Sequence, residues 1–229
     1  MESSYKSVFT KQGVRSLAVG CLLLFLALVF QYYSSSYSVR NSQRFVGDIF
    51  LDNLPAVDLN PLIVEGALLA ILFSLILLIR RPRYLIFAVK AAAILIALRA
   101  FFVAATHLRI YPSQVGPDSG FIDVIYARLG LEAGYFFSAH TALPFLMVLI
   151  FRDEKFWRYL YLLISVVFGA SVLLAHVHYS IDVFAAPFMA YSVYELTKYL
   201  FPRDYNLMIH KEYSPARSTS PPGKTVTHL

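Results

Sequence analysis

Two histidine motifs stand out in a sequence that is otherwise largely apolar. In "HVHYSIDV", His178 and Asp182 are four residues apart, which places them one turn apart on the same face of a helix. A carboxylate at that position can accept one N–H of the imidazole, fix its tautomer and make the other nitrogen more nucleophilic. Taken alone, such a pair is more often a structural ion pair or a cap at the start of a helix.

The second motif, "FFSAHTALP", places another histidine between two hydroxyl groups. His140 is flanked by Ser138 and Thr141 at the predicted start of a helix, where free backbone N–H groups favour an anion. Together the two motifs supply the parts for phosphoryl transfer through a covalent intermediate. His178, activated by Asp182, would attack phosphorus. His140 would then give a proton to the leaving oxygen and take one from the incoming nucleophile.

A metal site is the rival use of two histidines and an aspartate. The chain lacks the pair of histidines at i and i+4 that zinc proteases carry. His176 and His178 are two residues apart, so they would diverge on a helix. We therefore expect neither a metal nor another cofactor.

The elements that must position these residues are predicted to be helices of an all-α integral membrane protein. The chain has 229 residues, 58% of them hydrophobic, and a mean hydropathy of +0.61. A membrane-spanning helix needs about 20 mostly apolar residues. Six apolar runs are candidates, of which the fourth is the shortest: 14–33, 61–80, 84–107, 136–151, 157–177 and 180–201. A soluble helical protein with buried helices is the less favoured alternative.

Lysine and arginine orient these spans. Six spans leave both termini on one side, and most of the 20 Lys and Arg residues lie on that side, including the loops at 80–83 and 152–158. The positive-inside rule therefore predicts that both termini are cytoplasmic. The chain then divides into a cytoplasmic segment 1–13, a catalytic transmembrane domain 14–202, and a polar tail 203–229 that we expect to be mostly disordered.

Charge and composition restrict the other classes of function. The net charge of +6 follows from this topology and needs no nucleic-acid partner, since no basic stripe with interleaved aromatic residues is present. The single cysteine, Cys21, can form no internal disulfide. Glu65 and Arg99 lie toward the non-cytoplasmic side with the histidines, where they could pair or bind substrate. Only Lys90, with no evident partner, lies deeper, so a polar path for a transporter or channel is less favoured.

The motifs resemble those of a known enzyme family. "SAHT" followed by "AHVHYSIDV" is similar to the "SGHT" and "AH-x-HYT-x-DV" motifs of the sphingomyelin synthase family, a branch of the type 2 phosphatidic acid phosphatase superfamily. The segments "GDIFLDNLP" (47–55), "VEG" (64–66) and "LRAFFVAATHLRIYP" (98–112) resemble further family segments in the same order. The resemblance thus covers most of the predicted membrane core.

This resemblance implies six helices with cytosolic termini and a lipid phosphotransferase whose active site faces away from the cytoplasm. His178 would form the phospho-histidine, Asp182 would activate it, and His140 would be the acid and base, with no metal. A phosphocholine or phosphoethanolamine head group would move from a glycerophospholipid to a lipid alcohol such as ceramide. Homo-oligomerisation stays open. The substrate-binding residues would be Glu65, Arg99, Ser138, Thr141, Tyr179 and Asp48.

The sequence also departs from the family pattern. Ala139 replaces the glycine of "SGHT", and Ala133 and Tyr135 stand where the family often has Cys and Asp, so head group and acceptor stay open. The alternative function is a lipid phosphatase or phospholipase C-like hydrolase that uses the same histidines with water as acceptor. Its phosphate-binding cations are missing, because Ser74 takes the lysine position of K-x6-RP and "SVLLAHVH" has no arginine.

Overall fold

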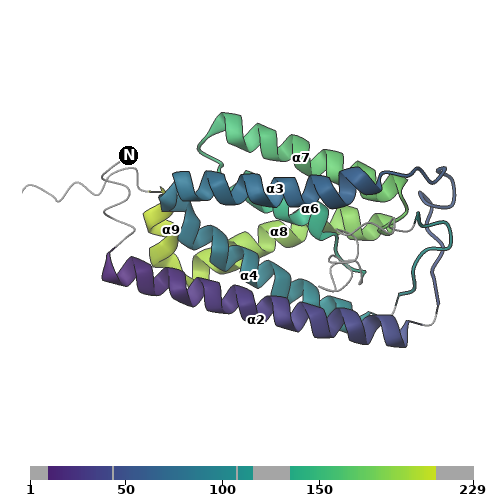
Figure 1. Ribbon diagram of the computed structural model, residues 1–229, viewed down its shortest axis with the longest axis horizontal. Helices are drawn as coiled ribbons and strands as arrows, with labels where there is room; N and C mark the ends of the chain where they lie inside the picture. The colour runs from purple at the N-terminus through teal and green to yellow at the C-terminus, as the bar shows by residue number, and fades with distance from the viewer. Residues whose placement is uncertain (1–9, 43, 107, 116–134, 210–229) are drawn as a thin grey trace, which may run out of the picture.

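The structure, a computed structural model, describes residues 10–42, 44–106, 108–115 and 135–209 (Figure 1). Within these residues the regular secondary structure is helical, apart from one isolated bridge between Arg44 and Leu108. The helices are α2 (Lys11–Asn41), α3 (Asn60–Arg80), α4 (Pro82–Ala105), α6 (Ala139–Ile150), α7 (Lys155–Leu174), α8 (Ser180–Leu200) and α9 (Pro202–Ile209). The prediction of an all-α chain is confirmed for this part.

Four of these helices, α2, α3, α4 and α7, are long and apolar enough to cross a membrane. The other two predicted spans are helical as well. However, α6 has only 12 residues, and α8, with 21 residues, does not reach the same hydropathy. The sequence places the start of the fourth span at 136, whereas α6 begins three residues later. The intervening residues 136–138 form a bend, with Phe136 at a φ of 73°, and are held by contacts described below.

Proline marks the beginning of several helices. Pro61 and Pro82 lie in the first turns of α3 and α4, and α9 starts at Pro202. Proline lacks the N–H that would be unpaired at these positions, and its fixed φ suits the first turn. The chain therefore breaks sharply between α3 and α4 and between α8 and α9.

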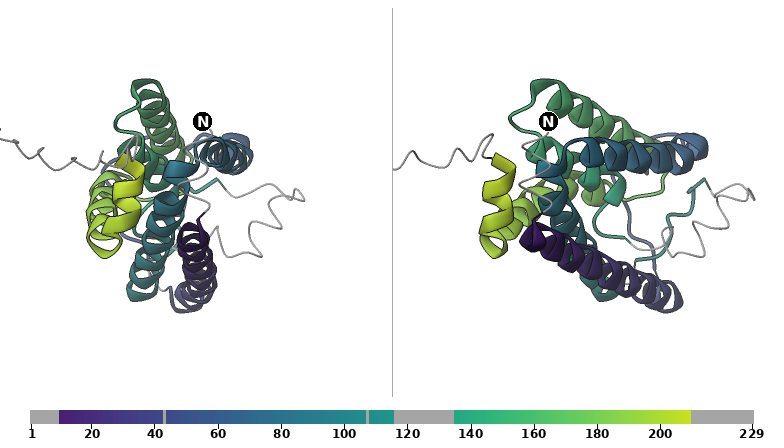
Figure 2. Two further views of the ribbon diagram at one scale, coloured as in Figure 1. Left: turned by 90° about the vertical axis from the view of Figure 1, so that its left-hand side faces the viewer. Right: turned by 60° about the vertical axis from the view of Figure 1, so that its left-hand side comes forward.

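Helix α2 lies on the outside of the bundle and packs along α4 (Figures 1 and 2). Small residues recur every seventh position on its buried face, at Gly13, Gly20, Ala27 and Ser34. This spacing lets two helices approach closely over several turns. The helix also extends beyond the predicted span 14–33, to Asn41. The polar residues that follow the span face α4 and are buried: Ser34, Ser35 and Ser38.

Helix α6 packs against α4, α7 and α8. The largest side chains with almost no exposed surface in this core are aromatic: Phe87, Phe137, Phe151 and Tyr161. Helix α3 lies against α4 and α7, and its apolar side chains remain largely exposed. In an apolar bilayer that exposure is expected for the outer surface of a helical bundle.

The start of α2 and the C-terminal helix α9 lie at one end of the bundle, together with the loops after α3 and α6 (Figure 2). The sequence predicts a disordered tail from 203, but the structure is helical through Ile209. The reason is a contact that the sequence alone does not reveal. Asp204 of α9 accepts a hydrogen bond from Lys90 of α4, at 2.5 Å. Residues 210–229 of the predicted tail lie outside the described part.

Candidate active site

The turn between α7 and α8 positions His178. Helix α7 ends at Leu174, and the N–H groups of Val177 and His178 both donate to the carbonyl of Val172, at 2.9 and 3.3 Å. His176 has a φ of 55°, in the left-handed region that non-glycine residues seldom adopt. This tight turn reverses the chain, so that His178 lies two residues before α8, which begins at Ser180.

His178 and Asp182 form the predicted pair. Nδ1 of His178 lies 3.1 Å from Oδ2 of Asp182, and both side chains are buried. The same Oδ2 accepts a hydrogen bond from the N–H of Tyr179, at 3.3 Å, so Asp182 also caps the start of α8. A carboxylate facing Nδ1 favours the tautomer with the proton on Nδ1. Nε2 is then the nitrogen with a free lone pair.

His140 approaches this pair from α6. The ring centroids of His140 and His178 are 6.1 Å apart, and Phe168 of α7 lies 6.1 Å from His140 on another side. Arg99 of α4 is close enough to act on His140 electrostatically. The two imidazoles therefore lie side by side, with their planes inclined by 63°, although they come from different helices.

The segment before α6 is held between α4 and α8. Thr106 donates to the carbonyl of Tyr135 at 3.0 Å, and Nε of Arg99 donates to the carbonyl of Phe137 at 3.1 Å. The N–H of Ser138 donates to the carbonyl of Asp182, also at 3.0 Å. These contacts fix where α6 begins, and therefore where His140 points.

The start of α6 is also a polar surface. Ser138 has no exposed surface, and Oγ1 of Thr141 lies 3.4 Å from its hydroxyl. The first N–H groups of any α-helix have no partner within the helix, which favours an anion there. The predicted hydroxyl pair therefore lies beside His140, as the motif "SAHT" indicates.

Two predicted substrate-binding residues have mainly structural contacts. Asp48 accepts hydrogen bonds from the N–H groups of Phe50, Leu51 and Ser180, at 2.9, 3.2 and 2.7 Å. Burial acts to raise the pKa of the Asp48 carboxyl, but these N–H groups outweigh it and hold that pKa below its ordinary value. The hydroxyl of Tyr179 donates to the carbonyl of Arg109, at 2.8 Å. Both side chains tie the loops to the start of α8.

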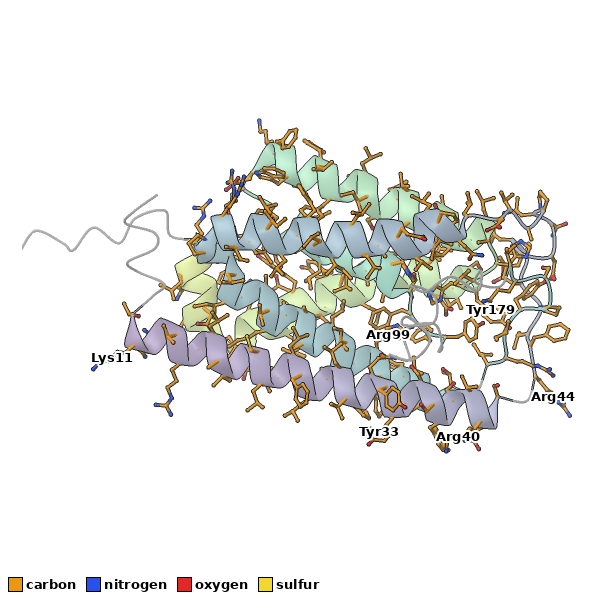
Figure 3. All side chains as sticks on the ribbon, in the orientation of Figure 1. Lys11, Tyr33, Arg40, Arg44, Arg99 and Tyr179 are labelled. Carbon is orange, nitrogen blue, oxygen red and sulfur yellow. The ribbon has the colours of Figure 1, made fainter. Side chains whose placement is uncertain are left out.

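The remaining two predicted residues are separated in the structure. Arg99 is buried beside the segment that precedes α6, whereas Glu65 is exposed on α3. No hydrogen bond or ion pair joins Glu65 to another residue in the described part of the chain, so the salt bridge considered from the sequence is not formed. Figure 3 shows Arg99 and Tyr179 in the half of the bundle that also contains Arg40 and Arg44, away from Lys11.

Two further residues shape the site. The ring of Tyr135 packs edge-on against His178, with centroids 6.1 Å apart. A Cβ at Gly169 of α7 would come within 3.2 Å of Val183 Cγ1 and 3.4 Å of Thr141 Oγ1, so α7 passes close to the start of α6. A glycine inside an apolar helix is the sequence signal for such an approach. Tyr135 gives no comparable signal.

Within the described residues, no group of three or more His, Cys, Asp or Glu side chains is placed to hold a metal ion.

Comparison with known proteins adds little to this geometry. No model of a known protein family matches the chain. The uncharacterized protein MJ0662 of Methanocaldococcus jannaschii is 31% identical to it over 101 residues, which are 44% of this chain and 40% of that protein. The chain thus spans about 40% of the length of that relative. Its name assigns no activity.

Proposed function

We propose that this chain is a six-helix membrane phosphotransferase similar to the sphingomyelin synthases, with both termini in the cytoplasm. The enzyme moves a phosphocholine or phosphoethanolamine head group from a glycerophospholipid to a lipid alcohol such as ceramide. The observation that carries this proposal is the geometry of three residues. His178 is oriented by Asp182, and His140 approaches from another helix with a ring separation of 6.1 Å.

The first half-reaction breaks the ester bond of the donor lipid. The lone pair on Nε2 of His178 attacks phosphorus, and the P–O bond to diacylglycerol breaks. The departing oxygen takes a proton from His140. Asp182 stabilises the positive charge that develops on His178, because its Oδ2 faces Nδ1 at 3.1 Å.

The second half-reaction returns the enzyme to its starting state. The hydroxyl of the acceptor lipid loses its proton to His140 and attacks phosphorus, and the P–N bond to His178 breaks. The products are diacylglycerol and a new phospholipid, and no net proton is consumed. If water takes the acceptor's place, the same steps release the phosphorylated head group, which is the hydrolase alternative.

The positions of the charged residues support the orientation of the site. The loops after α3 and α6 carry Arg80, Arg81, Arg83, Arg152 and Lys155, and they lie at the end of the bundle with α9. His178 lies at the opposite end, since it precedes α8 and α8 leads to α9. The positive-inside rule then assigns the active site to the non-cytoplasmic leaflet, where both lipid substrates can lie.

The test is a donor–acceptor assay with purified protein in detergent micelles. Phosphatidylcholine or phosphatidylethanolamine labelled in the head group is supplied with and without ceramide, and the products are read by mass spectrometry. We expect label in a new lipid only when ceramide is present. Label released into water regardless of ceramide would identify the hydrolase instead, and no movement of label would refute both.

The nucleophile is tested by trapping the intermediate. With donor lipid and no acceptor, wild-type protein should carry the labelled phosphoryl group on His178, and His178→Ala should carry none. Phe188→Ala is the matched control, because Phe188 is an exposed apolar residue of α8, the helix that follows His178. Turnover by His178→Ala above a few per cent of the wild-type rate would overturn this assignment.

A further inference from the structure

His176 lies two residues from His178 but takes no part in the reaction described above. Its side chain is 1% exposed, and its Nδ1 lies 2.6 Å from the hydroxyl of Ser113. Its Nε2 is buried without a hydrogen-bond partner among the described residues. Burying an imidazole in this way and holding its backbone at a φ of 55° both cost free energy. Its surroundings must therefore hold it firmly.

The contact with Ser113 is part of a larger attachment between the loop 108–115 and the turn before α8. The N–H of Val115 donates to the carbonyl of Ala175 at 3.1 Å. The ring of Tyr111 packs edge-on against His176, with centroids 5.6 Å apart, and its hydroxyl donates to Asp52. Ser113 itself is exposed, so its hydroxyl bridges the surface loop to a buried group.

The loop 108–115 is also linked to His178, through Tyr135. Gln114 accepts a hydrogen bond from the hydroxyl of Tyr135 at 3.0 Å, and the ring of Tyr135 packs edge-on against His178. The position of Tyr135 beside the nucleophile therefore depends on where Gln114 lies. Gln114 is next in sequence to Ser113, which His176 holds.

We propose that Ser113 and His176 form a positioning pair that holds Tyr135 against His178 and thereby sets the choice between a lipid alcohol and water as acceptor. This role rests on the proposed function. A phospho-histidine covered by an aromatic ring is shielded from water. An acceptor hydroxyl carried by a lipid can still approach from the membrane. When the pair is broken, the loop shifts, Tyr135 moves away, and water competes for the phosphoryl group.

The functional test measures the ratio of head group released into water to head group transferred to ceramide. Ser113→Ala should raise this ratio by about fivefold, the change in population that follows from the loss of one hydrogen bond. Ser113→Thr keeps the hydroxyl and should retain the wild-type ratio. His176→Asn should act like Ser113→Thr, because asparagine tolerates the left-handed backbone and its amide can replace Nδ1. His176→Ala should act like Ser113→Ala.

A second measurement separates the contact from the chemistry. Hydrogen exchange read by mass spectrometry reports on the backbone N–H of Val115, which should exchange faster in Ser113→Ala and at the wild-type rate in Ser113→Thr. Unchanged exchange in Ser113→Ala would refute the attachment. Faster exchange with an unchanged ratio of release to transfer would refute the role in acceptor choice.

A purely structural role would lower transfer and release together, leaving their ratio unchanged. That result would also overturn the proposal. If the wild-type protein neither transfers nor releases a head group, the proposed function fails and the role in acceptor choice fails with it. The exchange of Val115 would then still decide whether Ser113 and His176 hold the loop.

Discussion

A buried ion pair at the end of the bundle that contains α9 gives the sharpest prediction about stability. Nζ of Lys90 lies 2.5 Å from Oδ2 of Asp204 and 2.7 Å from the hydroxyl of Ser16. The hydroxyl of Ser16 also lies 2.9 and 3.0 Å from the two carboxylate oxygens of Asp204. The ring of Phe201 lies 4.2 Å from the ammonium group. This cluster joins α2, α4 and α9 through charges that are almost fully removed from solvent.

Lys90→Met removes one charge and leaves the other buried without compensation. The side chains of Lys90 and Asp204 are only 4% and 5% exposed, so water cannot replace the lost partner. Breaking a buried pair in this way costs about 3–5 kcal/mol. For a chain of this size, that loss corresponds to a fall in the unfolding midpoint of roughly 10 °C.

The double variant Lys90→Met/Asp204→Leu separates the charge from the packing. Replacing both members of a buried pair by apolar residues of similar volume is often neutral or stabilising. We therefore expect the double variant to recover most of the midpoint lost in Lys90→Met. The coupling between the two positions should be several kcal/mol, far above what distant sites show.

Thermal unfolding of the purified proteins in detergent, followed by size exclusion after heating, measures these midpoints. Lys198→Met is the matched control, because Lys198 pairs with Glu195 at 2.8 Å but the two side chains are 39% and 40% exposed. An exposed pair contributes about 0–1 kcal/mol. If Lys90→Met changed the midpoint as little as Lys198→Met, or if the double variant were less stable than either single one, the burial argument would be refuted.

Three further predictions concern the active site and its support. Asp182→Asn keeps the side-chain shape but removes the carboxylate beside His178, so transfer of the head group to ceramide should fall by up to about 10⁴-fold with little change in the unfolding midpoint. Gly169→Val adds atoms where a Cβ already approaches Thr141 Oγ1 within 3.4 Å, so both activity and the midpoint should fall, and Gly169→Ala should show a smaller effect. The lowered pKa of Asp48 stabilises the folded state above the ordinary carboxyl pKa of about 4 and stops doing so as pH falls through the lowered value. The difference in midpoint between wild type and Asp48→Asn should therefore be constant from neutral pH to about pH 4 and shrink below it. A difference that instead grows on acidification would contradict this assignment.

The helices were largely predictable because each depends on a local run of apolar residues. Their ends were not, because distant residues decide them. Helix α2 continues through Ser34 and Ser38 since those hydroxyl groups are buried against α4. Helix α9 is ordered by Lys90, which lies 114 residues away from Asp204 in the sequence. Lys90, which had no evident partner in the sequence, therefore forms a tertiary contact with Asp204.

In the candidate site, too, contacts between residues close in sequence were predictable and contacts between distant residues were not. His178 and Asp182 were predicted to meet because side chains four residues apart lie on one face of a helix. They do meet, but His178 precedes α8, and the turn at its N-cap Tyr179 brings the imidazole to Asp182. Asp48 and Arg99 were predicted to bind substrate on the resemblance to the sphingomyelin synthase family, in the segments 47–55 and 98–112. In the structure both have backbone partners, at the start of α8 and in the segment before α6, and binding of substrate stays a prediction.

Backbone N–H and C=O groups thus compete with substrate for the charged side chains, and sequence motifs do not reveal this competition. Every irregular segment at membrane depth leaves N–H and C=O groups that must be paired. The segment 135–138 and the start of α8 are such places, and they lie directly beside the histidines. A buried charge near this site can therefore either orient the backbone that positions a histidine or contact the substrate.

Because Nε of Arg99 already donates to the carbonyl of Phe137, replacing Arg99 should move His140 as well as remove a positive charge. Arg99→Lys keeps the charge but cannot reproduce the planar guanidinium donor. If Arg99 serves mainly to position α6, Arg99→Lys should lose as much activity as Arg99→Met. A lysine variant with near wild-type activity would show that the positive charge is what the reaction requires.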